Sequence, residues 1–173
     1  MRTKANTTQA ASQRVIIGVG NSYHGDDAVG HVVASRLVKE LDKQTPIRLL
    51  LESGEGRRLM TAWKNATLAI LIDATLSGVE PGTLYRIDAV TQPLASTWWR
   101  CSTPAFGVAE AIELARILHE LPARFLVYGI EGASFATGAP LSKAVERVIP
   151  DVLSQVRHDI ASLATAVESD RPI

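Results

Sequence analysis

Short apolar runs alternate along this chain with stretches in which apolar residues recur every three or four positions. Continuous runs rich in Val, Ile and Leu are typical of buried strands, and the wider spacing is typical of helices with one apolar side. The pattern predicts strands over 14–19, 47–51, 67–72, 83–87 and 124–130, and helices over 27–41, 56–64, 106–118 and 141–164. Pro150 lies inside the last helical stretch and can divide it in two. This alternation predicts an α/β fold with helices on both faces of a mainly parallel sheet.

The length of the chain and the character of its ends predict one domain between two tails. A chain of 173 residues is expected to form a single domain. Residues 1–13 are polar and lack the apolar segment of a secretory signal, so we expect a disordered tail there. We expect the α/β domain to cover 14–166 and a C-terminal tail to cover 167–173.

Composition then limits the partners and the compartment. The 18 basic and 18 acidic residues give a formal net charge of zero, which offers no electrostatic argument for nucleic acid or an anionic membrane. No apolar run approaches the roughly 20 residues that a membrane-spanning helix needs. A single cysteine, Cys101, excludes an internal disulfide, and a reducing, cytoplasmic location fits it best.

The fold class indicates which loops to search for chemistry, because ligands of open α/β sheets bind beyond the carboxyl ends of the strands. The first such loop, 20–27, argues against a nucleotide. Tyr23 takes the place of the third glycine of the dinucleotide pattern, and no Gly-Lys-Ser/Thr element follows. Two adjacent carboxylates, Asp26 and Asp27, would also repel a phosphate group.

Three aspartates near these strand ends are the main candidates for chemistry. Asp26 and Asp27 open a predicted helix, and capping that helix explains one of them fully and the second less well. Asp73 ends the apolar run of the third strand, where a carboxylate is costly unless it is paired. The alternative is that Asp73 caps a turn with Thr75 or Ser77. If the strands are neighbours, Asp27 and Asp73 converge, and they can then hold a divalent ion or share a proton.

Several segments together resemble the nickel–iron hydrogenase maturation endopeptidases. The resemblance runs from about Arg14 to the last helix and rests on the segments Gly18-Val19-Gly20-Asn21, Asp26-Asp27-Ala28-Val29-Gly30, Leu71-Ile72-Asp73-Ala74, Glu52-Ser53-Gly54-Glu55-Gly56, Phe106-Gly107-Val108-Ala109-Glu110-Ala111 and Tyr128-Gly129-Ile130-Glu131-Gly132. It implies a three-layer sandwich with a twisted five-stranded sheet. It also implies removal of a C-terminal extension from a hydrogenase large-subunit precursor after nickel insertion. The nickel carried by the substrate would be the recognition element, with no organic cofactor.

The resemblance also implies a set of three metal-contacting residues. Two of its positions carry over to Asp27 and Asp73, which we take as the catalytic and metal-contacting pair. The third is a histidine in the family, and this chain has Pro104 there, which offers no side-chain ligand. Since imidazole suits nickel well, nearby His24 is a candidate substitute. The alternative function is that of a non-proteolytic relative that binds or chaperones a hydrogenase precursor.

Further residues border the expected cleft. The residues that we assign to substrate contact are Gly20, Asn21, Asp26, Glu52, Gly54 and Glu131. No nucleophile–base set is evident around Ser22, Ser53, Ser102 or Cys101, so we expect an inert thiol. Trp98 and Trp99 are either a partner-binding patch or part of the core. His31 and His119 are expected to be surface or packing residues.

Overall fold

The computed structural model of the chain describes residues 13–41, 46–97 and 106–169. The strands are β1 (Arg14–Val19), β2 (Ile47–Glu52), β3 (Leu68–Thr75), β4 (Leu84–Asp88) and β5 (Arg124–Glu131). The helices are the 3-10 turn η1 (Gly25–Ala28), α1 (Val29–Glu40), α2 (Gly56–Trp63), α3 (Val108–Ile117) and α4 (Lys143–Ser169). In the described part of the chain, no helix combines the length and the apolar character that crossing a membrane requires.

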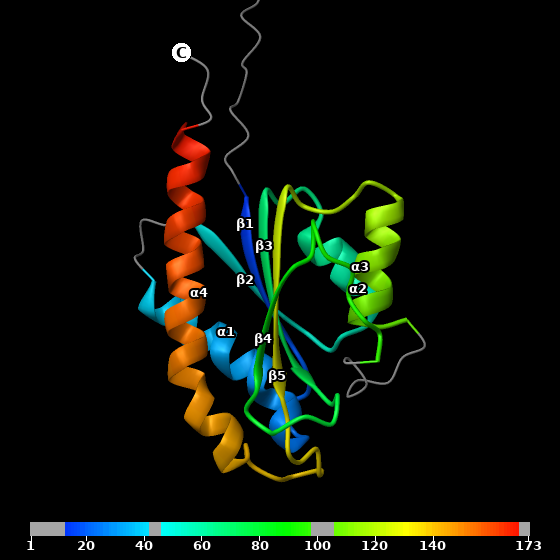
Figure 1. Ribbon diagram of the computed structural model, residues 1–173, viewed down its shortest axis with the longest axis vertical. Helices are drawn as coiled ribbons and strands as arrows, with labels where there is room; N and C mark the ends of the chain where they lie inside the picture. The colour runs from blue at the N-terminus through cyan, green and yellow to red at the C-terminus, as the bar shows by residue number, and fades with distance from the viewer. Residues whose placement is uncertain (1–12, 42–45, 98–105, 170–173) are drawn as a thin grey trace, which may run out of the picture.

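The five strands form one sheet in the order β2-β1-β3-β5-β4. All neighbouring pairs are parallel except β4, which runs antiparallel to β5. Helices α1 and α4 lie on one face and α2 and α3 on the other (Figure 1). The predicted three-layer α/β sandwich is therefore confirmed, and the predicted strand 83–87 is the antiparallel edge strand.

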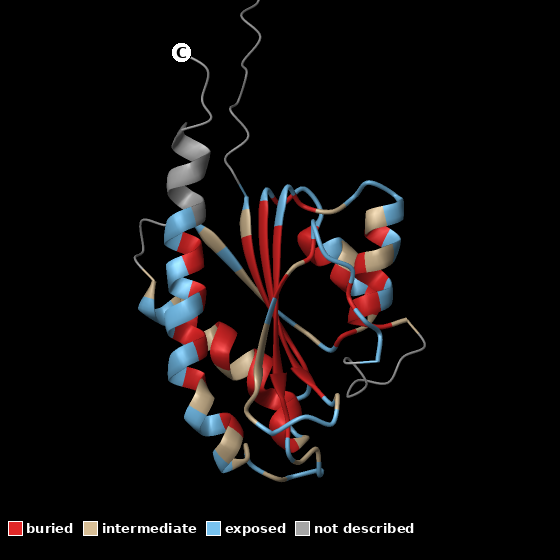
Figure 2. Cartoon of the chain, viewed as in Figure 1, coloured by how far each residue is buried: buried red, intermediate tan, exposed pale blue. Residues whose placement is uncertain are grey.

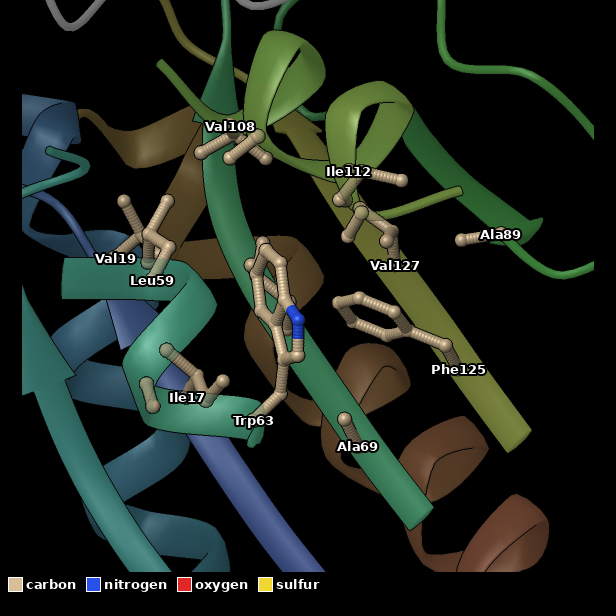
Figure 3. Close-up of a cluster of buried hydrophobic side chains, with 14 of the residues drawn as sticks. Ile17, Val19, Leu59, Trp63, Ala69, Ala89, Val108, Ile112, Phe125 and Val127 are labelled. Carbon is tan, nitrogen blue, oxygen red and sulfur yellow. The ribbon is translucent and has the colours of Figure 1, made fainter. Parts of the chain in front are cut away.

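Each face of the sheet packs against its own apolar layer. The inner strands β1, β3 and β5 are buried almost throughout, whereas β2 and β4 are partly exposed (Figure 2). Under α2 and α3, the rings of Trp63 and Phe125 pack with centroids 5.0 Å apart (Figure 3). Burying a large apolar side chain contributes roughly 1.5–3 kcal/mol, so these layers make a rigid base for the loops at the strand ends.

A close approach between α1 and the sheet determines where the first loop lies. A Cβ atom at Gly30 would lie 2.2 Å from the Val19 carbonyl oxygen and 2.3 Å from that of Ile72. Only glycine lets the helix approach the ends of β1 and β3 so closely. As a result, the turn η1, which directly precedes α1, lies against β3.

Three predicted boundaries differ from the structure. The helix predicted from Asp27 begins with the turn η1, and α1 itself starts at Val29. The prediction that the third strand ends at Asp73 is wrong, because β3 continues to pair with β5 as far as Thr75. Pro150 does not divide the last helix, which is continuous from Lys143 to Ser169. The proline ring is exposed, and the neighbouring Ile149 and Val152 keep the helix packed on the sheet.

Candidate functional site

Two buried aspartates meet at the carboxyl end of the sheet. Asp27 lies in η1 and is 6% exposed, and Asp73 lies in β3 and is 1% exposed. The negative charge of Asp27 acts on Asp73, so the turn and the strand bring these two carboxylates within electrostatic reach of each other. Asp27 and Asp73, which are 46 positions apart in the chain, thus lie in the same region at the carboxyl ends of the strands.

The Asp73 carboxyl group is only half satisfied. Its Oδ1 accepts a hydrogen bond from the Ala74 N–H at 2.9 Å, and its buried Oδ2 has no partner among the described residues. Burial, together with the charge of Asp27, raises the pKa of Asp73 well above its ordinary value. The turn-capping alternative fails, because Thr75 and Ser77 donate to Glu131 instead.

The Asp27 carboxyl group is also incompletely hydrogen-bonded, but nearby groups stabilise its charged form. Its buried Oδ1 also lacks a partner in the described structure. Burial raises the pKa of Asp27, opposed by a hydrogen bond from the Asn21 backbone and by the charges of His24 and His31. Two unpaired carboxylate oxygens in a buried setting are costly. A shared proton or a cation brought to the pair would satisfy both.

Asp26 has a different role from its neighbour. Its side chain is fully buried and accepts hydrogen bonds from the backbone N–H groups of Ala133 (2.7 Å), Ser134 (3.0 Å) and Ser142 (2.6 Å). These donors belong to the segment between β5 and α4. Asp26 therefore anchors η1 to that segment.

Glu131 is also an anchor. Its carboxylate accepts hydrogen bonds from the Thr75 hydroxyl, from the Ser77 hydroxyl and N–H, and from the Gly78 N–H, all between 2.8 and 3.0 Å. Burial acts to raise the pKa of Glu131, but these hydrogen bonds outweigh it and lower the pKa. With its acceptors occupied, Glu131 holds the β3–β4 loop in place.

A hollow of about 390 Å³ opens at the loop after β1, and we call it the first-loop hollow; neither Asp27 nor Asp73 lines it. It is lined by Gly20, Asn21, Ser22, Tyr23, His31, Leu51, Glu52, Ser53 and Arg58. Of the residues predicted to contact substrate, Gly20, Asn21 and Glu52 line it, whereas Asp26, Gly54 and Glu131 do not. A Cβ atom at Gly20 would lie 1.7 Å from the Asp27 carbonyl oxygen, so glycine is required for this loop to fold over Asp27.

His31 is part of this region, although the sequence analysis assigned it to a surface or packing role. Its Nε2–H donates to the Glu52 carbonyl at 3.0 Å, and its Nδ1 lies 3.1 Å from the Ser22 hydroxyl. A carbonyl can only accept, which determines that Nε2 carries the proton. The signal was present in the sequence, because residues four apart share one side of a helical segment and His31 follows Asp27 at that spacing.

His24 lies near Asp27, as its electrostatic effect on that carboxylate indicates. Its use as a metal ligand stays a prediction. Among the described residues, no three His, Cys, Asp or Glu side chains form a group that could hold a metal ion. Pro104, Cys101, Ser102, Trp98 and Trp99 lie outside the described residues, so their predicted roles stay predictions too.

Comparison with known proteins finds relatives of one kind. A family model described as hydrogenase maturation protease, HycI, matches residues 33–158, a range that includes Asp73 and begins after Asp27. The hydrogenase expression/formation protein HupD of Thiocapsa roseopersicina is 23% identical over 140 residues, which are 80% of this chain and 63% of that protein. HupD of Rhizobium leguminosarum is 23% identical over 158 residues, covering 91% of this chain and 78% of that protein.

The fold recurs in a solved structure of the same kind. The hydrogenase maturating endopeptidase HybD from Escherichia coli superposes with a TM-score of 0.65 at 24% identity, covering 91% of this chain and 94% of that one. At this identity the likeness shows the shared fold, whereas the match of the family model extends over most of the chain. The chain belongs to the hydrogenase maturation protease family.

Proposed function

We propose that this protein is an endopeptidase that removes the C-terminal extension of a nickel–iron hydrogenase large-subunit precursor after nickel insertion. The observation that supports this function best is the pair Asp27 and Asp73, buried together with one unpaired oxygen each. A structural role would leave those oxygens satisfied, as it does for Asp26 and Glu131. In this proposal the reaction takes place in the cytoplasm.

Two chemical roles fit the pair. With Asp73 protonated and Asp27 ionised, the pair can hold one proton between them, and Asp27 can act as a general base on water. Alternatively, the unpaired oxygens can contact the nickel that the precursor carries, which would polarise the scissile carbonyl. In both cases the nickel belongs to the substrate. The proposal assigns the chain to be cut to the first-loop hollow, whose lining residue Gly20 lies against the Asp27 backbone.

Incubation with a nickel-loaded precursor tests the proposal directly. The mass of the large subunit should fall by that of the extension when the unaltered protein is added. Asp27→Asn and Asp73→Asn should each lower the rate at least about a hundredfold, the order typical of losing an acid or base. Asp151→Asn, which removes an exposed carboxylate on α4, should change it less than twofold. A full-length subunit after prolonged incubation would count against the proposal.

Pro104 supports a second candidate, a relative that binds the precursor without cutting it. Proline at the family's third metal-contacting position removes a ligand that nickel favours. Pro104→His should then raise the affinity for Ni²⁺, measured by isothermal titration calorimetry, by about tenfold or more. Imidazole suits nickel, and even the loss of a residue that only orients a ligand costs about 10–100-fold in metal affinity. An intact precursor that co-purifies with the unaltered protein, and is cut only by the Pro104→His variant, would favour this candidate.

A further inference from the structure

One long edge of the sheet has unpaired backbone groups. The Gly20 N–H donates to the Glu52 carbonyl at 3.0 Å, so the backbone groups of Glu52 face β1. Along a strand these groups point alternately to either side. The N–H and C=O groups of Leu49 and Leu51 therefore face away from β1, and no strand among the described residues pairs with that side of β2. Such an edge is a template for one more strand.

The two edges of the sheet differ in how they are protected. On β4, Arg86 binds Asp159 of α4 at 2.6 and 2.9 Å, and Asp159 also accepts from the Tyr128 hydroxyl. Charge and cover of this kind discourage pairing at an edge. On β2, the Arg48 side chain turns toward α2 and donates to the Ala62 carbonyl at 2.7 Å. The described structure thus leaves the β2 edge accessible.

A groove between β2 and α2 runs beside this edge and adjoins the first-loop hollow. The β2–α2 groove has a volume of about 480 Å³ and is lined by Arg48, Leu50, Glu52, Glu55, Arg57, Arg58, Thr61 and Ala62. It shares Glu52 and Arg58 with the first-loop hollow, so the two adjoin at the carboxyl end of β2. A strand added at the edge would place alternate side chains in the groove and would end at the first-loop hollow.

Charge indicates what such a strand should carry. Arg58 is paired with Glu52 at 2.9 Å, and Arg48 is bound to a carbonyl group. Arg57 is exposed, and its guanidinium takes part in none of the ion pairs formed by the described residues. It lies in the first turn of α2, near the end of the groove that adjoins the first-loop hollow. A carboxylate on the added strand would pair with it.

We propose that the C-terminal extension of the precursor docks as a strand along the outer edge of β2, with an acidic side chain bound by Arg57. This inference rests on the proposed function, and it determines in which direction the added strand runs relative to β2. The scissile bond must lie at the aspartates, and the extension then crosses the first-loop hollow to the carboxyl end of β2 and continues along that strand toward Ile47. The added strand is therefore antiparallel to β2, and the acidic residue lies within the first few positions after the cut.

The test uses the full chain and a fluorescent synthetic peptide that spans the cleavage point of the precursor. Amide exchange followed by NMR should slow at Leu49 and Leu51 when the peptide is added, and it should stay unchanged at Leu50, which already pairs with β1. Leu49→Pro removes an outward N–H and breaks no hydrogen bond to β1. Fluorescence anisotropy should therefore show about tenfold weaker binding. Leu49→Ala loses the same side chain but keeps the N–H, and it should bind within about threefold of the unaltered protein.

A second pair of variants tests the charge without altering the backbone. Arg57→Gln should weaken binding about tenfold, and Arg147→Gln, which removes an exposed arginine on α4, should leave it unchanged. Absence of saturable binding, equal binding by the proline and alanine variants, or slowed exchange that spares Leu49 and Leu51 would each overturn the inference. Docking without cleavage of nickel-loaded precursor would instead overturn only the proposed function. Cleavage without docking at β2 would overturn only the inference.

Discussion

At the scale of single residues, the three aspartates of the first loop and β3 differ in what satisfies them. Asp26 has three N–H donors, whereas Asp27 and Asp73 each retain a buried oxygen without a partner among the described residues. Leaving a buried acceptor unpaired costs about 1–3 kcal/mol. The protein therefore holds Asp27 and Asp73 together at a cost in stability, which is common where binding or catalysis needs a group in an unfavourable setting.

The cost of burying the Asp73 carboxylate predicts how Asp73→Asn should change the stability of the protein at different pH values. The folded state keeps the Asp73 proton to a higher pH than the unfolded state, since burial and the Asp27 charge raise its pKa. Between the ordinary pKa of an aspartate and the raised pKa of Asp73, the folded state binds more protons than the unfolded state. The free energy of unfolding therefore falls as the pH rises through this interval. Asparagine carries no such charge. The variant should be about 0.5–2 kcal/mol more stable at pH 8 and within about 0.5 kcal/mol at pH 4.

Urea unfolding at the two pH values measures this difference. Asp151→Asn is the matched control, because it removes an exposed carboxylate and should shift stability by less than about 0.5 kcal/mol at either pH. An Asp73→Asn variant that is less stable than the unaltered protein at pH 8 would mean that the Asp73 carboxylate is satisfied by a partner.

At the scale of elements, periodicity predicted all five strands and the four α-helices but missed details at the site. The end of β3 could not be predicted from its own residues, because Asp73 and Thr75 extend the strand only by pairing with β5. The turn η1 was missed for a similar reason, since its position depends on the close approach of Gly30 to β1 and β3. These contacts join segments far apart in the chain, and no local pattern reports them.

Contacts between distant segments also explain why the sequence indicated some features of the site and not others. Strand ends and acidic residues predicted that Asp27 and Asp73 lie at one edge of the sheet, and the family resemblance predicted their roles, which stay predictions. The anchoring contacts of Asp26 and Glu131 depend on which backbone N–H groups the fold brings to them, and sequence spacing does not state this. His31 was available from its spacing after Asp27 but looked like an ordinary helix residue.

At the scale of the whole molecule, Asp26 joins the start of the fold to its end. Its carboxylate binds the segment between β5 and α4, and the Asp26 N–H donates to the Ser134 carbonyl at 2.8 Å. This link connects the turn that carries Asp27 with the helix that covers the same face of the sheet. The position of Asp27 over β3 therefore depends on a contact more than a hundred residues away in the chain.

Asp26→Ala should accordingly reduce the free energy of unfolding by about 3 kcal/mol, because three backbone N–H groups lose the buried carboxylate that accepts from them. Since domains of this size are stable by roughly 5–15 kcal/mol, the variant should still fold at 25 °C, and urea unfolding measures the loss. Asp151→Ala is the control and should lose less than about 0.5 kcal/mol. A loss for Asp26→Ala as small as the control's would show that the link is not needed to hold the turn, and Asp27 would then owe its position to the contact of Gly30 with β1 and β3 alone.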